Sequence, residues 1–274
     1  MRRLKENVLK ALILLSAIFT ISVLVVIVGF IIIKGINGIN FKYLTSDYSA
    51  GEGGGILSMI ITTLYTVFLS ILVATPVGVL AAIYLQEYAK KGKFVNSVRF
   101  ATESLAGIPS IVYGLFGGIF FVITLKMGYS ILAGSLTVSI IILPLIIRTT
   151  EESLKTVPIG YREASLAMGA TKFQTICKVI IPSAAPGILS GIILSIGRIV
   201  GESAAILLTA GTVAKMPTGI FDSARTLTVQ SYLLAKETGN IQAAASVGVV
   251  LIVIVLCLNA LAKFIVKKFS KEIY

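Results

Sequence analysis

Arg198 and Glu202 are two ionisable residues inside an otherwise uncharged stretch, Pro182–Leu208. Four residues is about one turn of an α-helix, so both side chains fall on one face if the stretch is helical. An arginine in the middle of a membrane costs about 2.5–3.5 kcal/mol on insertion scales, so it is expected to face a cavity or a partner. The pattern therefore predicts a functional position rather than a lipid-facing one.

Guanidinium chemistry indicates what such a position holds. The planar group of Arg198 offers forked donors that match the oxygens of phosphate and carboxylate groups. The carboxylate of Glu202, one turn away, is expected to pair with the arginine when no anion is bound. The alternative is a purely structural Arg–Glu pair, but buried pairs contribute little net stability, which favours the functional interpretation.

Arg148 is a second arginine at the edge of an apolar run, three residues before Glu151 and four before Glu152. Two interpretations stay open for it. It is either a second anion contact or a terminal arginine that reaches the membrane surface. Glu103, at the start of another run, is a weaker candidate because a carboxylate there simply suits a helix N-terminus.

A stretch of different character, EASLAMGATKFQTICKVIIP (163–182), separates two apolar runs. A helix is predicted to begin near Pro158, because proline is favoured in the first helical turn. Gly169 suits the left-handed position after a helix C-terminus. Thr171 can cap a second helix, Lys172–Ile181, before Pro182. The pattern predicts a helix–turn–helix hairpin at the membrane surface, over residues 156–182.

The predicted hairpin has an apolar face that a simple connecting loop would not need. Its members are Ala164, Leu166, Ala167, Met168, Phe173 and Ile176. An amphipathic helix of this kind docks into the groove of a partner protein, or it lies on the lipid surface. The spacing alone leaves both possibilities open.

The rest of the chain consists largely of apolar runs, with 56% hydrophobic and 13% charged residues among 274. A helix needs about 20 apolar residues to cross a membrane. Six runs meet this requirement, which predicts an all-α polytopic membrane protein with six transmembrane helices. They are Ala11–Ile33, Ile56–Leu85, Ser104–Leu125, Met127–Ile147, Pro182–Leu208 and Ile241–Ala262.

The net charge of +12 follows membrane topology rather than nucleic-acid binding. With six alternating spans, sixteen Lys and Arg residues fall on one side and six on the other, which predicts both termini in the cytoplasm. The first run is too long for a signal peptide and is expected to be retained. The inside set is Arg2, Arg3, Lys5, Lys10, Lys90, Lys91, Lys93, Arg99, Lys155, Arg162, Lys172, Lys178, Lys263, Lys267, Lys268 and Lys271. The outside set is Lys34, Lys42, Lys126, Lys215, Arg225 and Lys236.

Several chemistries are absent from the sequence. There is no histidine, which removes histidine metal ligands and histidine bases. Cys177 is assigned to an inside loop and Cys257 to a span, so the two are not expected to form a disulfide. No G-x-x-x-x-G-K-[ST] motif occurs, so the chain is not expected to bind ATP through a P-loop. We therefore expect neither an enzyme nor a cofactor-binding protein, and any ATPase must be another polypeptide.

The hairpin pattern is more specific than its helices alone. Glu163-Ala164-Ser165, three residues, Gly169, nine residues and then Val179–Pro182 resembles the EAA motif of ABC-importer permeases, E-A-A-x3-G-x9-I-x-L-P. Ser165, Val179 and Ile181 are mild departures from that motif. In that family the hairpin docks on the ATP-binding subunit. The resemblance thus implies that Glu163, Ala164, Ser165 and Gly169 couple the chain to an ATPase.

Longer stretches are similar to phosphate ABC-transporter permeases of the PstA family. They are AAIYLQEY (81–88), LAGIPSIVYGLFG (105–117) and GRIVGESAA (197–205), and the resemblance covers roughly residues 50–266. The family usually has Ala-Gly-Glu-Thr where this chain has Val200–Ser203. The resemblance places phosphate-pathway arginines at Arg148 and Arg198, whereas the place of Glu202 in the pathway follows from its spacing to Arg198.

This resemblance implies a type I ABC-importer permease fold in the cell membrane. Residues 1–55 would hold the tail, first span and outer loop, 56–267 the five-helix transport domain, and 268–274 a cytoplasmic tail. The implied partners are a PstC-like second permease in a heterodimer, two PstB-like ATP-binding subunits and a PstS-like extracytoplasmic phosphate-binding protein. The alternatives are a permease for molybdate or sulfate, or an ion-coupled secondary carrier, which has no use for a docking hairpin.

Overall fold

The structure, a computed structural model, describes residues 2–48, 54–90 and 92–271 and contains only helices there. The predicted all-α class is confirmed. Five segments, each a single helix or consecutive helices, are long and apolar enough to cross a membrane. A bent pair of helices makes a sixth span if the pair crosses as one. The five are Leu9–Gly38, Leu57–Tyr88, Ile131–Lys155, Lys172–Val200 and Ile241–Phe264.

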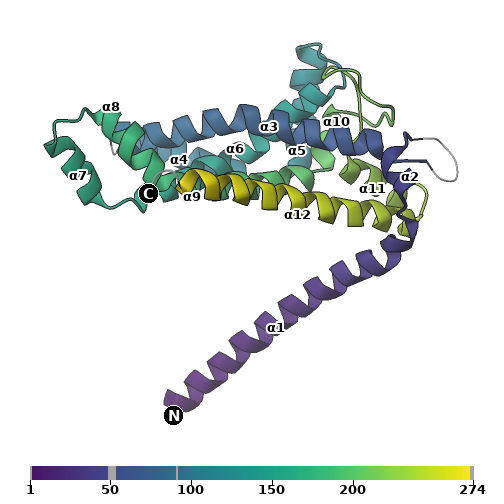
Figure 1. Ribbon diagram of the computed structural model, residues 1–274, viewed down its shortest axis with the longest axis horizontal. Coiled ribbons are helices and arrows are strands. Elements are labelled where there is room, and N and C mark those ends of the chain that lie inside the picture. Colours follow the sequence, from purple (N-terminus) through teal and green to yellow (C-terminus); the bar gives the residue numbers. More distant parts are fainter. Residues whose placement is uncertain (1, 49–53, 91, 272–274) are drawn as a thin grey trace.

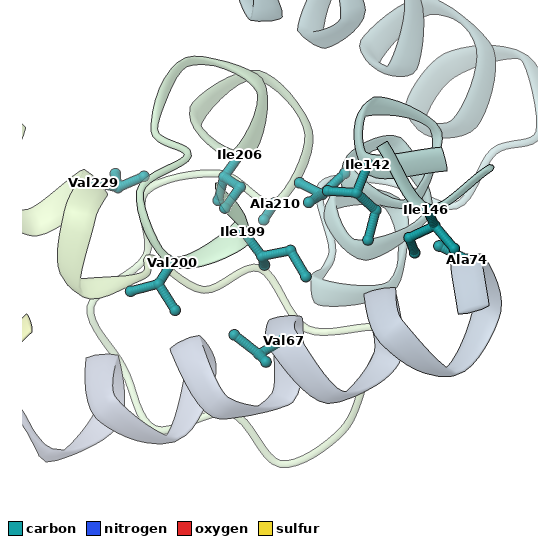
Figure 2. Close-up of a cluster of buried hydrophobic side chains, with 10 residues drawn as sticks. Val67, Ala74, Ile142, Ile146, Ile199, Val200, Ile206, Ala210 and Val229 are labelled. Atoms are coloured by element: carbon teal, nitrogen blue, oxygen red, sulfur yellow. The ribbon is translucent and has the colours of Figure 1, made fainter. Parts of the chain in front are cut away.

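Three of these segments form the centre of the bundle: α3 (Leu57–Ile83), α6 (Ile131–Lys155) and α9 (Ile181–Val200). Figure 2 shows their buried aliphatic side chains meeting between the helices. Val67 and Ala74 come from α3, Ile142 and Ile146 from α6, and Ile199 and Val200 from α9. Each of these six residues is less than 8% exposed. The apolar core therefore fixes how α6 and α9, the helices with the candidate arginines, lie against α3.

The third predicted span is the bent pair. α4 (Lys93–Ala106) and α5 (Ser110–Gly117), which continues as the π-helix η3 (Gly118–Thr124), meet at 99°. The prediction of one helix over Ser104–Leu125 was wrong at its start, since 104–106 belong to α4. Pro109 explains the break, because proline disfavours helical backbone in the residue before it.

The fifth predicted span, Pro182–Leu208, was wrong at both ends. Its helix runs unbroken from Lys172 through α9, ends at Val200, and resumes as α10 (Ala204–Thr209). Gly201 carries the chain out of the helix, and the Glu202 amide donates to the carbonyl of Ile199 in a tight turn, 3.1 Å. The break falls directly after Arg198.

The stretch 209–240, between the fifth and sixth predicted spans, packs partly into the bundle. α11 (Leu227–Lys236) lies against α12 (Ile241–Lys271), and its residues Leu227 and Val229 are fully buried. The segment after the first predicted span, 34–55, holds a short 3-10 turn, η1 (Ile36–Gly38), and α2 (Phe41–Thr45); residues 49–53 lie outside the described residues. Residues 210–226 remain a loop.

α1 (Arg2–Gly35) stands apart from the bundle (Figure 1). The C-terminal end of α1 touches α12, where the hydroxyl of Ser246 donates to the carbonyl of Gly35 at 2.8 Å. The rest of the helix presents exposed apolar side chains, so it needs lipid or another subunit to cover it.

Candidate functional site

The seam between α6 and α9 positions both candidate arginines. Gly187 stands against Ser153 and Gly191 against Thr149, so closely that a Cβ on either glycine would overlap the facing hydroxyl side chain. Residue numbers increase along α9 while those of the facing residues on α6 decrease, so the two helices run antiparallel. Small residues allow this approach, as is common between membrane helices.

This register puts Arg198 and Arg148 at two depths along the seam. Arg198 follows Gly191 by about two turns along α9. By the same register it lies level with Ile142. Arg148 is six residues from Ile142 (148 minus 142), which is about 9 Å along the axis at 1.5 Å per residue.

Arg198 is exposed, and no hydrogen bond or ion pair from the described residues holds its guanidinium group. It ends a row of exposed positions spaced by one turn along α9, Pro186, Ser190 and Leu194. A free guanidinium at the end of a membrane helix is not stable against lipid tails, so this face requires water or another polar surface.

Glu202 does not pair with Arg198, which corrects the expectation from their spacing. Its Oε1 atom accepts a hydrogen bond from the Ala205 amide at 3.1 Å, and the residue is only 8% exposed. No ion pair between these two side chains is found in the part of the chain that the structure describes. The helix break at Gly201 turns Glu202 away, so the one-turn rule does not apply, and the carboxylate satisfies the first turn of α10 instead.

Tyr113 of α5 is a neighbour that sequence reasoning missed. The residue is 7% exposed, packs with Ile141 and Ala205, and donates from its hydroxyl to the carbonyl of Leu105 at 2.8 Å. Tyr113 therefore ties α5 to the first turn of α10, just after the helix break that follows Arg198. A single tyrosine in an apolar run was the signal in the sequence.

Arg148 is also exposed, at the end of the bundle where the hairpin lies. It lines a small pocket of about 110 Å³ between α4 and α6, together with Arg99, Glu103 and Glu151. Arg99 donates to the Glu151 Oε1 atom at 3.3 Å, and its Nη2 atom also reaches Gln86 Oε1 at 3.4 Å. This charged cluster was not predicted, since α4 and α6 are distant in sequence.

The hairpin turn forms as the sequence predicts. α7 (Ile159–Ala167) ends in a Schellman motif, in which Gly169 donates to the carbonyl of Leu166 at 3.0 Å and Ala170 to that of Ser165 at 3.2 Å. Gly169 has φ +82°, the left-handed region that disfavours residues with a Cβ. The predicted capping role of this glycine is confirmed.

The second leg of the hairpin differs from the prediction. Thr171 caps α8 (Lys172–Thr175) in a capping box with Gln174, as expected. The helix does not end at Ile181, however, but continues through the π-helix η4 (Ile176–Ile180) into α9. The wider π-helical turn makes room for the ring of Pro182 without breaking the helix. The second leg is therefore the end of a span rather than a separate surface helix.

The tip of the hairpin projects from the end of the bundle (Figure 1). Glu163, Ala164 and Gly169 are exposed, whereas the Ser165 hydroxyl lies 2.9 Å from that of Thr175 and ties the two legs together. Ile176, predicted on the apolar face, is instead buried, because it packs beneath the hairpin. The exposed apolar residues of the hairpin are Ile159, Tyr161, Leu166, Met168 and Phe173, between 50% and 88% exposed. Such a surface is suited to docking.

Comparisons with known proteins agree with this arrangement. The sequence is 34% identical over 281 residues to the probable ABC transporter permease protein YqgI of Bacillus subtilis (strain 168), covering 96% of each chain. It is 38% identical over 210 residues to the phosphate transport system permease protein PstA of Pasteurella multocida (strain Pm70), covering 76% of this chain and 75% of that one. A chain in the crystal structure of a bacterial alginate ABC transporter superposes with a TM-score of 0.73 at 16% identity, covering 97% and 96%.

The same arrangement of helices in that importer confirms the predicted ABC-importer permease fold. Residues 74–271 also match the family described as "Binding-protein-dependent transport system inner membrane component". The match spans more than half of the sequence, and the predicted resemblance is confirmed. This chain belongs to the family of binding-protein-dependent transport system inner membrane components.

Proposed function

We propose that this chain is the membrane-spanning permease subunit of an ATP-driven importer of inorganic phosphate. The observation that carries the proposal is the pair of unpaired, exposed arginines, Arg198 and Arg148, at two depths along one helix seam. A forked cation is the side chain best suited to phosphate oxygens. The chain is similar to permeases that are named for phosphate transport.

The exposed arginines also call for a second subunit. A PstC-like permease packed as a heterodimer against this face would enclose Arg198 and Arg148 in a pathway and keep them from lipid. Phosphate would meet Arg198 first and Arg148 about 9 Å further on. Because Arg198 makes no ion pair with a carboxylate in the described residues, its contact with phosphate forms and breaks without exchange of an ion pair.

The hairpin is the proposed site of energy input. Glu163, Ala164, Ser165 and Gly169 lie at its exposed end or hold its turn, and the apolar tip fits a groove on one of two PstB-like ATP-binding subunits. The chain itself performs no chemistry and needs no cofactor in this proposal. The hairpin end then faces the cytoplasm, as the Lys and Arg distribution predicts, with both termini on that side of the cell membrane.

The opposite end of the bundle would meet the extracytoplasmic phosphate-binding protein, which is PstS-like in this proposal. Residues 210–226 are the loop available there, next to α10 and α11. Residues 56–267 form the transport domain, preceded by α1 and its loop.

The proposal is tested by reconstituting all four kinds of subunit in vesicles and measuring ATP-dependent uptake of labelled phosphate. Sulfate and molybdate are added as competitors, because they are the other oxyanions that a permease of this kind could carry. We expect uptake that requires ATP and the binding protein and that neither competitor reduces. Uptake of sulfate or molybdate in place of phosphate would assign another oxyanion, and uptake driven by an ion gradient without ATP would contradict the importer.

A further inference from the structure

The two legs of the hairpin both hold the same short segment, the π-helix η2 (Tyr84–Tyr88) at the end of α3. From the first leg, Arg162 donates to the Oε1 atom of Glu87 at 2.8 Å. From the second leg, the Lys172 ammonium lies 4.8 Å from the centre of the Tyr88 ring. Two independent contacts therefore join the hairpin to neighbouring residues of η2.

Arg162 is held in place from three sides. Besides Glu87, it donates to the carbonyl of Val157 at 2.9 Å and to that of Leu154 at 3.0 Å. The side chains of Arg162 and Glu87 are 22% and 9% exposed, so the pair is largely shielded from water. A charge-assisted bond with this shielding is stronger and less screened than a surface ion pair.

An apolar cluster lies beneath these polar contacts and joins the same elements. Its buried residues come from the end of α3, the end of α6 and the loop after it, η4 and the start of α9. They are Ile83, Leu154, Val157, Ile176, Ile180, Ala184 and Ile188. The hairpin thus rests on the end of α3 through both packing and charge. Such a unit is expected to move as one body, because packed interiors transmit displacement.

The chain connections show why these contacts matter. α6 leads directly into the hairpin, and the hairpin leads directly into α9, so any movement of the hairpin reaches both through the backbone. α3 is the third central helix and has no such connection, although α3 and α6 form the most extensive helix pair of the bundle. Only non-covalent contacts can carry hairpin movement to it.

We propose that Arg162 and Glu87 transmit the ATPase-driven movement of the hairpin to α3, with Lys172 and Tyr88 as a second, weaker link. The inference rests on the proposed function, since it assumes that the hairpin docks on an ATPase. Arg162 is a positioning residue here: it touches neither phosphate nor nucleotide. Loss of the link weakens the transfer of hairpin movement to α3, so less phosphate is imported for each ATP hydrolysed.

The test uses the complete reconstituted transporter with Glu87→Gln, Arg162→Gln and the double variant. Glutamine keeps the size of Glu87 but removes its charge. We expect all three to co-purify with the ATPase and to keep phosphate-independent hydrolysis, while phosphate imported per ATP falls about tenfold in each single variant. The double variant should fall no further, because both changes remove one shared interaction.

Two further variants keep the test decisive. Lys155→Gln removes another ion pair of 2.8 Å, to Glu152, but one that is exposed and lies within α6, so coupling should be unchanged. Tyr88→Leu removes the ring under Lys172, whereas Tyr88→Phe keeps it. If Glu87→Gln prevents assembly, lower coupling in Tyr88→Leu but not in Tyr88→Phe still supports the link. Unchanged coupling in Glu87→Gln and Tyr88→Leu, or losses in the double variant that multiply, would overturn the inference. Failure of the unmodified transporter to import phosphate would instead overturn the proposed function.

Discussion

Gly191 of α9 lies against Thr149 of α6, with no room for a methyl group between its Cα atom and the threonine hydroxyl. This contact and its neighbour one turn away fix how far the two helices approach and in what register. Arg198 and Arg148 take their relative depths from that register. The spacing of the proposed anion contacts therefore depends on small residues that never meet the anion.

Gly191→Ala should force α6 and α9 apart and destabilise the permease by about 1–3 kcal/mol, the usual cost of an overpacked core. The thermal unfolding midpoint of the detergent-solubilised complex measures the effect. Gly197→Ala is the matched control on the same helix, because a Cβ there meets nothing within 4 Å. It should be neutral or stabilising by up to about 1 kcal/mol. Equal midpoints for the two variants would show that the seam is not close-packed.

Gly169→Val should disrupt the hairpin turn. With φ +82°, a residue with a Cβ is strained by about 1–2 kcal/mol, and a branched one by more, although no neighbouring atom crowds the position. We expect normal membrane insertion but weaker co-purification with the ATP-binding subunits. Gly160→Ala, in the first turn of α7 and equally uncrowded, is the control and should retain the ATPase. Normal transport-coupled hydrolysis in Gly169→Val would argue against the docking role.

Single cysteines should report the orientation in the membrane. In a chain with Cys177→Ser and Cys257→Ser, an impermeant thiol reagent should label Lys215→Cys in intact cells and Gly160→Cys only after lysis. Lys215 and Gly160 are both exposed and lie toward opposite ends of the bundle, which makes them suitable probes of its two sides. The reverse labelling pattern would invert the proposed topology.

Asp222 should make the loop at residues 218–222 sensitive to acid. Its Oδ2 atom accepts hydrogen bonds from the hydroxyl and amide of Thr218 and the amide of Gly219, and these bonds hold the pKa of the carboxyl below its usual value. Because the pKa in the folded loop is depressed, the stabilisation is present above the usual aspartate pKa of about 3.9 and is lost as the pH falls through the folded pKa. A spin label at Lys215→Cys should remain ordered at pH 5 and become mobile only in stronger acid. In an Asp222→Ala background the label should be mobile at every pH. An ordered label at every pH in that variant would exclude a role for Asp222 in ordering the loop.

The residues show which features the sequence could predict. The turn at Gly169 was predictable because its motif is local: a helix end, a left-handed glycine and a cap at Thr171 follow one another along the chain. The Arg198–Glu202 pair was predicted wrongly because the one-turn rule assumes a continuous helix. The break at Gly201 depends on α10 packing back onto α5 and α6, which is a tertiary effect.

The links of the hairpin to η2 had no signal in the sequence at all. Arg162 and Glu87 are 75 residues apart, and each taken alone suits a membrane surface. The same holds for Arg99 and Glu151, 52 residues apart. Periodicity gave the apolar runs, but it could not show that the run ending at Leu125 is bent or that the chain around Pro182 is one helix.

Uptake of labelled phosphate by Arg198→Lys in the reconstituted transporter tests the central claim most directly. Lysine keeps the charge but loses the forked donors, a difference of about 1.5–3 kcal/mol for a charge-assisted contact, so uptake should fall by roughly ten- to a hundredfold. The subunits should still co-purify, since Arg198 makes no hydrogen bond or ion pair in the described residues, and Lys236→Gln, at an exposed position outside the loop 210–226, should transport normally as the charge control. Full phosphate uptake by Arg198→Lys would contradict the proposed pathway.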